Sequence, residues 1–427
     1  MDIQKLYQLF LNSRKVSTDT RKIEPGCIFF ALKGEKFDGN KFAAEALRKR
    51  AAYVVVDDKE VAKDERYILV KDVLTALQDL AKHHRKQLNI PVIGLTGSNG
   101  KTTTKELIRE VLATKYKVFA TQGNLNNHIG VPLSVLSITD DVDIAVIEMG
   151  ANHVGEIAAL SKISQPTHGF ITNIGKAHIG TFGGFENIIR GKTELYQWLI
   201  ENKGVVFINS QDPILSNMAW RFEAPVFYPA KQDYYHAEFM DANPFIRFIA
   251  ENGELVHTQL IGAYNFSNVA VALCIGKYFE VDAAKAQMAV ANYIPSNNRS
   301  QIIKRGSNTI IMDAYNANPS SMTAAIENID KMQADSKVLI LGDMFELEEE
   351  AEKEHRAIGE LLAAKNFAQV LLCGELMRSA KAAYPAALQF DTKEALADYL
   401  NANKIENALV LLKASRGIGL ETILQYL

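Results

Sequence analysis

The sequence has few cysteines and no long apolar run, and each absence narrows the class of protein. Only 3 of the 427 residues are cysteine, Cys27, Cys274 and Cys373, and their spacing fits neither a metal site nor a disulfide framework. We therefore expect buried free thiols in a reducing cytoplasm. No apolar run reaches the roughly 18 residues that a membrane span needs, and the first residues lack the apolar core of a signal peptide. The sequence predicts a cytoplasmic protein with no membrane span.

Net charge is also small, and its distribution is uneven. The formal net charge is −3, and no basic stripe with interleaved aromatic residues is present, which argues against a nucleic-acid partner. Residues 1–90 hold 18 Lys+Arg against 13 Asp+Glu, a local excess of 5 positive charges. That excess suits an anionic substrate, although ordinary surface scatter explains it equally well.

The length and the alternation of elements predict an α/β protein of three domains. A chain of 427 residues is too long for one ordinary core. From residue 91 apolar strands alternate with helices, which is the pattern of a mostly parallel sheet covered on both faces. We expect a small N-terminal α/β domain (1–88), a central P-loop parallel-sheet domain (89–298) and a C-terminal Rossmann-like domain (299–427), separated by the breaks at Asn89-Ile90-Pro91 and at residues 295–300.

Particular elements follow from the same pattern. The expected central strands are 92–95, 117–120, 143–148, 168–172, 204–208 and 225–227, with a small antiparallel patch within 234–260. In the last part we expect a final helix at 418–426, and we interpret the acidic run from Glu346 to Glu354 as a solvated helix start.

A glycine-bearing loop between a strand and a helix is the strongest chemical signal. Its glycines let the backbone approach a phosphate, and the following helix adds the positive end of its dipole. The usual pattern has glycine where this chain has Leu95, so the match is imperfect. A chance lysine in a glycine-rich turn is the weaker interpretation, because strand, loop, Gly-Lys-Thr and helix occur in the right order. The residues predicted to bind a nucleoside triphosphate are Gly97, Ser98, Asn99, Gly100, Lys101, Thr102 and Thr103.

Three further polar groups follow neighbouring strands or open a helix. Glu148 ends the strand at 143–148, where a carboxylate either binds Mg²⁺ beside the loop or caps a helix. His178 follows the next strand, and a structural role and a catalytic role are equally open. Lys192 stands near a helix N-terminus, where a cation is electrostatically misplaced; taken alone it is more simply a solvated side chain.

Further candidate site residues lie toward the end of the chain. Asn265 and Asn268 lie on one helical face and either hydrogen-bond a base edge or cap neighbouring turns. Arg299 is placed to reach a transferring phosphate, and Asp313 ends a strand where a ribose hydroxyl is often held. Ser415-Arg416, between a strand and a helix, is a plausible carboxylate clamp.

Taken together and in this order, these motifs resemble the Mur ligase family across nearly the whole chain. The Thr96-Gly97-Ser98-Asn99-Gly100-Lys101-Thr102 loop is similar to the family's ATP loop, off-pattern glycines included. Glu148-Met149-Gly150 and Thr172-Asn173-Ile174-Gly175 match family positions, as do the single residues His178, Lys192, Asn265, Asn268, Arg299 and Asp313. One departure is Gly191-Lys192-Thr193-Glu194, where the family more often has Ala-Lys-Gly-Glu.

The resemblance implies a ligase that consumes ATP. ATP would phosphorylate a substrate carboxylate, and an amine would attack the acyl phosphate to give an amide, ADP and phosphate. The residues that the family would use in catalysis are Lys101, His178, Lys192 and Arg299. It also implies two Mg²⁺ ions, one held by Thr102 and Glu148, the other by His178 and a Lys192 carbamoylated by CO₂.

Within the family, other motifs resemble the branch that adds D-Ala-D-Ala to UDP-MurNAc-tripeptide in cytoplasmic peptidoglycan precursor synthesis. These motifs are Asp19-Thr20-Arg21 with Phe37-Asp38-Gly39, the stretch 123–132, the stretch 313–319, and Leu341-Gly342-Asp343-Met344. The residues implied in substrate binding are Thr20, Arg21, Lys36 and Phe37 for the UDP end, Asn124, Asn126 and Asn127 between substrate and metal, and Asn316, Ser415 and Arg416 for the dipeptide. A monomer is expected.

Three alternatives remain. The branch that adds the third peptide residue usually carries an Asp-Asn-Pro-Arg motif, which this sequence lacks. A folylpolyglutamate-type ligase is the second. A nucleotide-binding regulator that ligates nothing is the third, and it is disfavoured because the whole set of transfer residues is present; a nucleic-acid motor, for which the sequence lacks a basic stripe, is weaker still.

Overall fold

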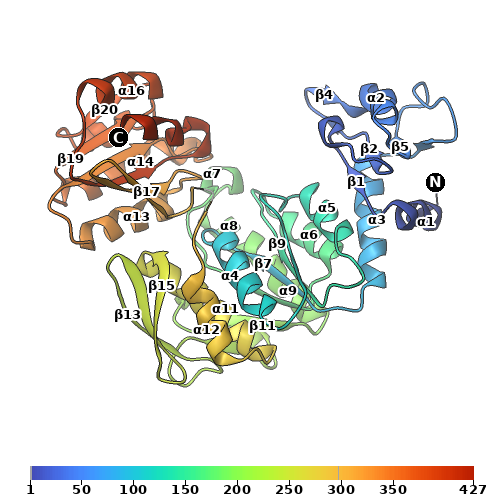
Figure 1. Cartoon of the computed structure of the whole chain (residues 1–427), viewed down its shortest axis with the longest axis horizontal. Coiled ribbons are helices and arrows are strands. Elements are labelled where there is room, and N and C mark those ends of the chain that lie inside the picture. Colours follow the sequence, from blue (N-terminus) through green and yellow to red (C-terminus); the bar gives the residue numbers. More distant parts are fainter. Residues whose placement is uncertain (1, 297) are drawn as a thin grey trace.

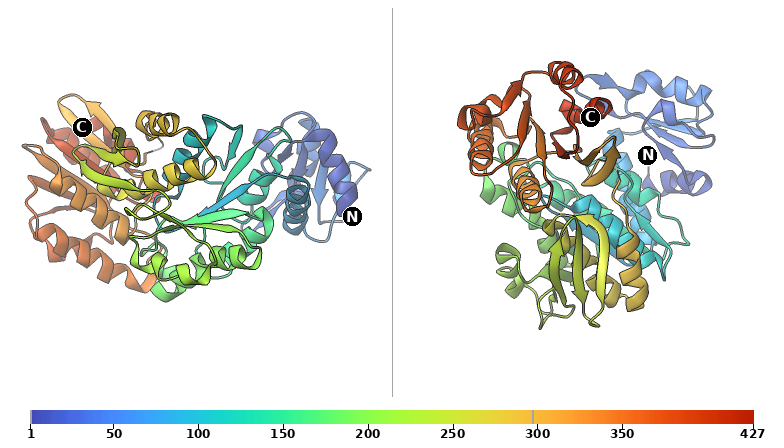
Figure 2. Two further views of the ribbon diagram at one scale, coloured as in Figure 1. Left: turned by 90° about the horizontal axis from the view of Figure 1, so that it is seen from below. Right: turned by 60° about the vertical axis from the view of Figure 1, so that its left-hand side comes forward.

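The computed structural model describes residues 2–296 and 298–427 and shows three α/β parts in a bent row (Figure 1). The N-terminal part and the C-terminal part lie at opposite ends, with the central part between them, and a view from below shows the same order (Figure 2). Asn297, in the expected second boundary, lies outside the described residues. That each part folds as a separate domain stays a prediction.

The N-terminal part is a four-stranded parallel sheet in the order β1-β2-β5-β6. Its strands are β1 (Val16–Ser17), β2 (Ile28–Phe30), β5 (Tyr53–Val56) and β6 (Tyr67–Leu69), with a small hairpin of β3 (Lys33–Gly34) and β4 (Phe37–Asp38). Its helices are α1 (Ile3–Ser13), α2 (Ala43–Arg48) and α3 (Val73–Gln87). Helix α3 packs on α1 and also on two helices of the central part, so it joins the two parts.

The central part is a six-stranded sheet in which every strand is parallel, in the order β12-β11-β10-β7-β9-β8. Its strands are β7 (Val92–Thr96), β8 (Val118–Ala120), β9 (Ile144–Glu148), β10 (His168–Ile171), β11 (Val205–Asn209) and β12 (Val226–Tyr228). All five residues of β7 and of β9 are buried. A strand covered on both faces needs apolar side chains in both directions, which explains the continuous apolar runs that predicted these strands.

Helices cover both faces of this sheet. One face packs against α4 (Lys101–Ala113), α11 (Phe266–Tyr278) and α12 (Ala283–Asn292), and the other against α5 (Gly130–Leu136), α6 (Glu156–Ser164) and α9 (Glu194–Glu201). The short helices α7 (Ile179–Phe182) and α8 (Phe185–Lys192) follow β10, and α10 (Pro213–Ser216) follows β11. The expected antiparallel patch is confirmed as β13 (Ala237–Ala242), β14 (Phe245–Ala250) and β15 (Leu255–Ile261).

The C-terminal part is a second six-stranded sheet, in the order β16-β17-β21-β18-β19-β20. Only β16 runs antiparallel to its neighbour. Its strands are β16 (Gln301–Arg305), β17 (Asn308–Asp313), β18 (Lys337–Gly342), β19 (Gln369–Cys373), β20 (Leu388–Phe390) and β21 (Leu409–Lys413). Its helices are α13 (Pro319–Lys331), α14 (Ala351–Ala363), α15 (Arg378–Ala383) and α16 (Lys393–Ala402). The α/β fold class is confirmed.

Two expectations for the C-terminal part hold only in part. Residues 418–426 are expected as one helix, whereas the structure has 3₁₀ helices at Arg416–Ile418 and Leu420–Tyr426, separated by Gly419 at φ +70°, a left-handed conformation that interrupts a helix. The acidic run does lead into a helix and is mostly exposed, but Glu354 is only 4% exposed, and both Glu346 and Glu354 contact the central part.

The structure bears on the cysteines and on the apolar segments. The three cysteines are buried and free. Over the ranges that the structure describes, no helix has both the length and the apolarity to cross a membrane.

Candidate active site

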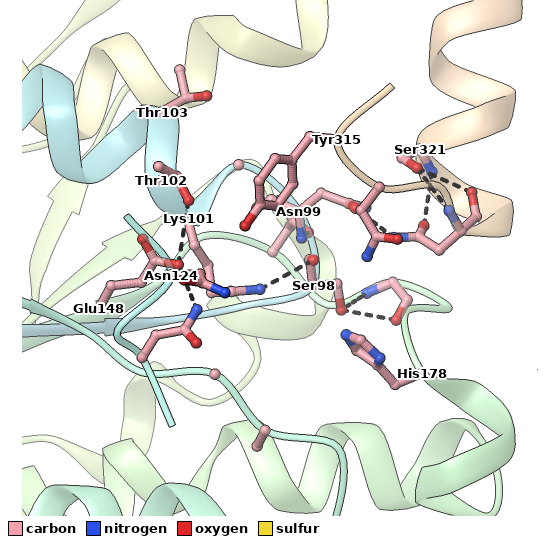
Figure 3. Close-up of a pocket in the computed structure, with 18 of the residues that line it drawn as sticks. Ser98, Asn99, Lys101, Thr102, Thr103, Asn124, Glu148, His178, Tyr315 and Ser321 are labelled. Atoms are coloured by element: carbon pink, nitrogen blue, oxygen red, sulfur yellow. Dashed lines mark hydrogen bonds between the residues drawn. The ribbon is translucent and has the colours of Figure 1, made fainter. Parts of the chain in front are cut away.

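A cavity of about 970 Å³ opens where the carboxyl ends of β7, β9 and β10 face the C-terminal part (Figure 3). Parallel strands point their carboxyl ends to one edge of the sheet, and ligands of open α/β sheets bind outside that edge. The predicted site residues that line the cavity are Ser98, Asn99, Gly100, Lys101, Thr102, Thr103, Asn124, Asn126, Asn127, Glu148, His178, Asn265, Asn268, Arg299, Asp313 and Asn316.

The loop between β7 and α4 requires its glycines. Gly97 has φ +147°, and a Cβ atom there would lie 1.9 Å from Oγ1 of Thr172. Gly100 has φ +78° at the start of α4, where a Cβ atom would lie 2.8 Å from Nδ2 of Asn268. Leu95, which stands where the usual pattern has glycine, is the fourth residue of β7 and is fully buried. The off-pattern position therefore belongs to the strand rather than to the loop.

Hydrogen bonds to the end of β10 hold the loop in place. The backbone N–H of Asn99 donates to Oδ1 of Asn173 at 3.0 Å, and the Thr172 hydroxyl donates to the Asn99 carbonyl at 2.7 Å. The Ser98 hydroxyl donates to the Gly175 carbonyl and accepts from the Gly175 N–H, both at 2.9 Å. A loop fixed in this way presents its remaining groups in one geometry.

Lys101 begins α4, and its Nζ folds back to donate to the carbonyls of Gly97 at 2.7 Å and Ser98 at 3.4 Å. Burial lowers the pKa of Lys101; the nearby charge of Arg299 acts in the same direction, and Glu148 opposes both. The cavity thus holds two cationic side chains and a carboxylate close to the loop, which is the charge pattern that a polyphosphate requires.

Glu148 is 2% exposed and has one unsatisfied oxygen. Its Oε1 accepts from the Thr102 hydroxyl at 3.3 Å and from Nδ2 of Asn126 at 2.8 Å, whereas its Oε2 is buried without a hydrogen-bond partner. A buried free carboxylate oxygen beside a hydroxyl fits Mg²⁺, which prefers oxygen ligands. No group of three or more His, Cys, Asp or Glu side chains that could hold a metal occurs among the described residues, so phosphate and water oxygens would complete the shell.

His178 and Lys192 are both in the central part but in different surroundings. His178 lines the cavity at φ +57°, and its Nδ1 lies 2.5 Å from Oε2 of Glu346 in the C-terminal part. This contact is the main reason that the pKa of Glu346 is lowered. Lys192 is fully buried, so its interpretation as a solvated side chain is wrong. Its Nζ donates to the Ala151 carbonyl at 3.2 Å, and burial, reinforced by the charge of Lys101, holds its pKa well below the usual value.

The C-terminal part brings aromatic and charged groups to the cavity. The Arg299 guanidinium lies 3.6 Å from the centre of the Tyr315 ring, a stacking distance. Asp313 accepts from Nζ of the buried Lys413 at 2.5 Å and from the N–H of Ser300 at 3.2 Å. Asp313 is therefore already ion-paired where the sequence predicted a contact with ribose.

Other predicted residues lie away from the cavity lining. Arg21 pairs with Asp19 at 2.8 Å, which lowers the pKa of Asp19 to about 2. The Ser415 hydroxyl is buried and already bonded, since it donates to the Ala317 carbonyl at 3.3 Å and accepts from the Phe345 N–H at 2.9 Å. The predicted residues that do not line the cavity are Thr20, Arg21, Lys36 and Phe37 in the N-terminal part, together with Gly97, Lys192, Ser415 and Arg416.

Several cavity residues were not predicted from the sequence. Tyr264, Tyr315, Ser320 and Glu346 line the cavity, and so does Asn318. Asn318 caps α13, a role that Asn followed by Pro signals, but its second contact has no local signal. Its Nδ2 donates to Oδ1 of Asn99 in the nucleotide loop at 2.8 Å.

The Asn99–Asn318 hydrogen bond is one of several polar ties between the central and C-terminal parts. Others join His178 to Glu346, Nζ of Lys176 to Oε1 of Glu354 at 2.6 Å, and the Tyr264 hydroxyl to the Ser300 hydroxyl at 3.1 Å. The backbone N–H of Lys176 also donates to the Ser320 hydroxyl at 2.9 Å. The cavity is thus formed jointly by two parts of the chain.

A phosphate loop on a parallel sheet, closed by a second α/β part, is typical of nucleotide-dependent enzymes. This chain belongs to the Mur ligase family. The matching family models are the Mur ligase family, catalytic domain (residues 13–85), the Mur ligase middle domain (95–276) and the Mur ligase, glutamate ligase domain (298–416).

The similarity to particular members extends over almost the full length. A UDP-N-acetylmuramoyl-tripeptide--D-alanyl-D-alanine ligase of Bacillus subtilis is 37% identical over 424 residues, 96% of this chain and 92% of that protein. The crystal structure of MurF from Acinetobacter baumannii superposes with a TM-score of 0.88 at 29% identity, covering 98% of this chain and 97% of the other. MurF ligase from Thermotoga maritima in complex with ADP gives a TM-score of 0.86 at 28% identity, covering 97% of each chain.

Proposed function

We propose that this chain is an ATP-dependent ligase that joins D-Ala-D-Ala to UDP-MurNAc-tripeptide. The observation that carries the proposal is the 37% identity to the Bacillus subtilis ligase over 96% of this chain, together with a complete phosphate loop facing Glu148. The reaction belongs to peptidoglycan synthesis and thereby to cell-wall biogenesis, cell shape and cell division.

The chemistry proceeds in two transfers. A terminal carboxylate oxygen of the tripeptide attacks the γ-phosphorus of ATP, ADP leaves, and an acyl phosphate forms. The amine of D-Ala-D-Ala then attacks the acyl carbon, loses a proton, and the tetrahedral intermediate expels phosphate to leave an amide. Lys101 and Arg299 neutralise the charge that develops on the transferring phosphoryl group. Mg²⁺ held by Thr102 and Glu148 would supply further positive charge at the phosphate oxygens.

Lys192 is a candidate for carbamoylation. Burial lowers the pKa of Lys192 and so favours the neutral, nucleophilic amine, the form that adds to CO₂ to give a carbamate and one proton. The carbamate and His178 would hold a second Mg²⁺. Lys192→Ala is expected to lose most activity and to regain part of it with added bicarbonate or acetate; full activity without them would contradict this role.

The three parts of the chain bind different portions of the substrates. The N-terminal part (1–88), with its positive excess, binds the UDP end through Thr20, Arg21, Lys36 and Phe37. Residues Asn124, Asn126 and Asn127 lie between the peptide and the metal, inside the cavity. The C-terminal part (299–427) binds the dipeptide through Asn316 and Arg416, with Ser415 in a supporting role because its hydroxyl is already bonded. The central part (89–298) binds ATP through its loop, Asn265 and Asn268, and the C-terminal part completes the ATP site with Arg299 and Asp313. The enzyme is a cytoplasmic monomer.

The deciding experiment measures phosphate release with ATP, Mg²⁺ and UDP-MurNAc-tripeptide, comparing D-Ala-D-Ala with single amino acids. Release with the dipeptide alone, and a UDP-linked pentapeptide by mass, is the expected result. Turnover of a UDP-linked dipeptide with one amino acid would assign the chain to the branch that adds the third residue. Binding of ATP with no turnover for any amine would leave a regulator.

A further inference from the structure

Lys105 is a fully buried lysine of α4 that the proposed mechanism does not use. Its side chain is 0% exposed, and an ammonium group is costly to bury unless it is paired. Its Nζ donates to the Thr121 carbonyl, lies 3.0 Å from Oε1 of Glu106 and 3.9 Å from Oε2 of Glu148. The inner partner of this lysine is thus the carboxylate of the candidate magnesium site.

Thr121 connects Lys105 to the backbone that carries Glu148. Its carbonyl accepts from Lys105, and its hydroxyl accepts from the N–H of Glu148 at 3.0 Å. The two carboxylate oxygens then have different neighbours, since Oε1 faces Thr102 and Asn126 whereas Oε2 has Lys105 as its charged neighbour. Lys105 therefore fixes the orientation of Glu148 from behind.

Lys105 also changes the electrostatic potential at the candidate magnesium site. Nζ of Lys105 lies 3.9 Å from the buried carboxylate of Glu148, and the charge of Lys101 interacts with those of both Glu148 and Arg299. Glu106 does not cancel Lys105 alone, because its Oε2 also pairs with Nη1 of Arg109 at 3.0 Å. A bare divalent cation thus meets positive potential, whereas the phosphates of a bound nucleotide reverse the local balance.

We propose that Lys105 is a positioning residue that holds Glu148 and makes divalent-cation binding depend on bound nucleotide. The inference rests on the proposed function, because it takes Glu148 and Thr102 as metal ligands. It adds a role that the transfer chemistry does not need: Lys105 keeps the metal site from filling before ATP arrives.

The test measures Mn²⁺ binding by the paramagnetic resonance of free Mn²⁺, with the full-length protein and no nucleotide. Lys105→Met keeps the length of the side chain and removes the charge, so it is expected to bind Mn²⁺ about tenfold more tightly than the wild type. Lys105→Arg restores the charge and is expected to return the affinity toward the wild-type value. Lys115→Met removes a charge just past the end of the same helix, where Nζ contacts Phe279 and Glu280 rather than Glu106 or Glu148, and should leave the affinity within about twofold.

A second variant, at Glu106, tests the same proposal if Lys105→Met fails to fold. Glu106→Gln leaves Lys105 with Glu148 as its charged partner, so nucleotide-free Mn²⁺ binding should weaken by roughly threefold. Unchanged or weaker Mn²⁺ binding by a folded Lys105→Met variant would overturn the inference. If Lys105→Met does not fold, unchanged Mn²⁺ binding by Glu106→Gln would overturn it.

The same titration with ADP separates the two proposals. Wild-type protein that binds Mn²⁺ only with ADP supports both the metal site and the role of Lys105. Failure to bind Mn²⁺ even with ADP would remove the metal site itself and with it part of the proposed function. Tight Mn²⁺ binding by the wild type without nucleotide would overturn the role of Lys105 alone.

Discussion

At the scale of the residue, Gly97 is the position in the nucleotide loop with least tolerance for a side chain. Its Cβ would lie 1.9 Å from Oγ1 of Thr172 at φ +147°, so Gly97→Ala must displace the loop from β10. We expect at least a tenfold loss of ADP affinity by calorimetry. Gly26→Ala is the matched control, because Gly26 also has positive φ (+84°) but has no atom within 4 Å of its Cβ position. If Gly97→Ala bound ADP with wild-type affinity, the loop would accommodate the added methyl group without losing its binding geometry.

His168 provides a pH-dependent prediction. It begins β10 among the rings of Phe207, Tyr278 and Phe279, and burial lowers its pKa to about 4. The unfolded chain takes up a proton near pH 6.5 and the folded chain only near 4, so stability falls as the pH falls through this window. The loss is about 3 kcal/mol, from 1.36 kcal/mol per pKa unit.

The check compares urea unfolding of the wild type with His168→Gln at pH 7 and pH 4. The glutamine variant lacks the titrating group, so it should lose less stability than the wild type over that range. Equal losses in the two proteins would show that His168 is protonated in the folded state at pH 4.

At the scale of the element, the sequence predicted strands most accurately where both faces of the strand are buried. β7 and β9 are uniformly buried, and their apolar runs were evident. β16 was missed because all five of its residues are half-buried or exposed, so no apolar pattern marks it. The same logic applies to the cavity: Lys101 and Glu148 lie at strand ends that parallel geometry brings together. Glu346 reaches the cavity only through the packing of two parts of the chain, which no local pattern encodes.

Helix α3 joins the N-terminal and central parts, and Arg85 fixes its end. The guanidinium is 6% exposed and donates to four carbonyls, those of Ser164, Leu88, Gln165 and Ile90. Ser164 ends α6, whose negative dipole end favours a cation.

Arg85→Lys keeps the charge but cannot serve four carbonyls, so we expect a stability loss of about 2 kcal/mol in urea unfolding. The KM for the UDP-linked substrate should rise more than the KM for D-Ala-D-Ala, because α3 orients the N-terminal part. Lys86→Met, at the exposed neighbouring position, is the control and should change neither. A stability loss without a selective change in KM would reduce Arg85 to a purely structural role.

At the scale of the molecule, the tie between Lys176 and Glu354 is the one most open to test. Glu354 is 4% exposed and its Oε1 lies 2.6 Å from Nζ of Lys176. Glu354→Gln removes the ion pair, so the nucleotide-free protein should show a larger radius of gyration by small-angle scattering, and the KM for D-Ala-D-Ala should rise roughly threefold. Glu352→Gln, at an exposed position of the same helix, should leave both values unchanged. An identical scattering curve for Glu354→Gln would mean that the other ties between the two parts suffice.

The polar ties between the central and C-terminal parts have a consequence for how the chain is connected. Single polar pairs at such a contact contribute about 0–1 kcal/mol each, too little to unite two separate molecules. The C-terminal part follows α12, which ends at Asn292, and resumes with β16 at Gln301, so a short stretch of backbone tethers it. Covalent connection through so short a stretch gives the two parts a high effective concentration, at which weak contacts form and release repeatedly. Cutting the chain within this stretch should therefore abolish turnover in dilute solution, and high concentrations of both fragments should restore it.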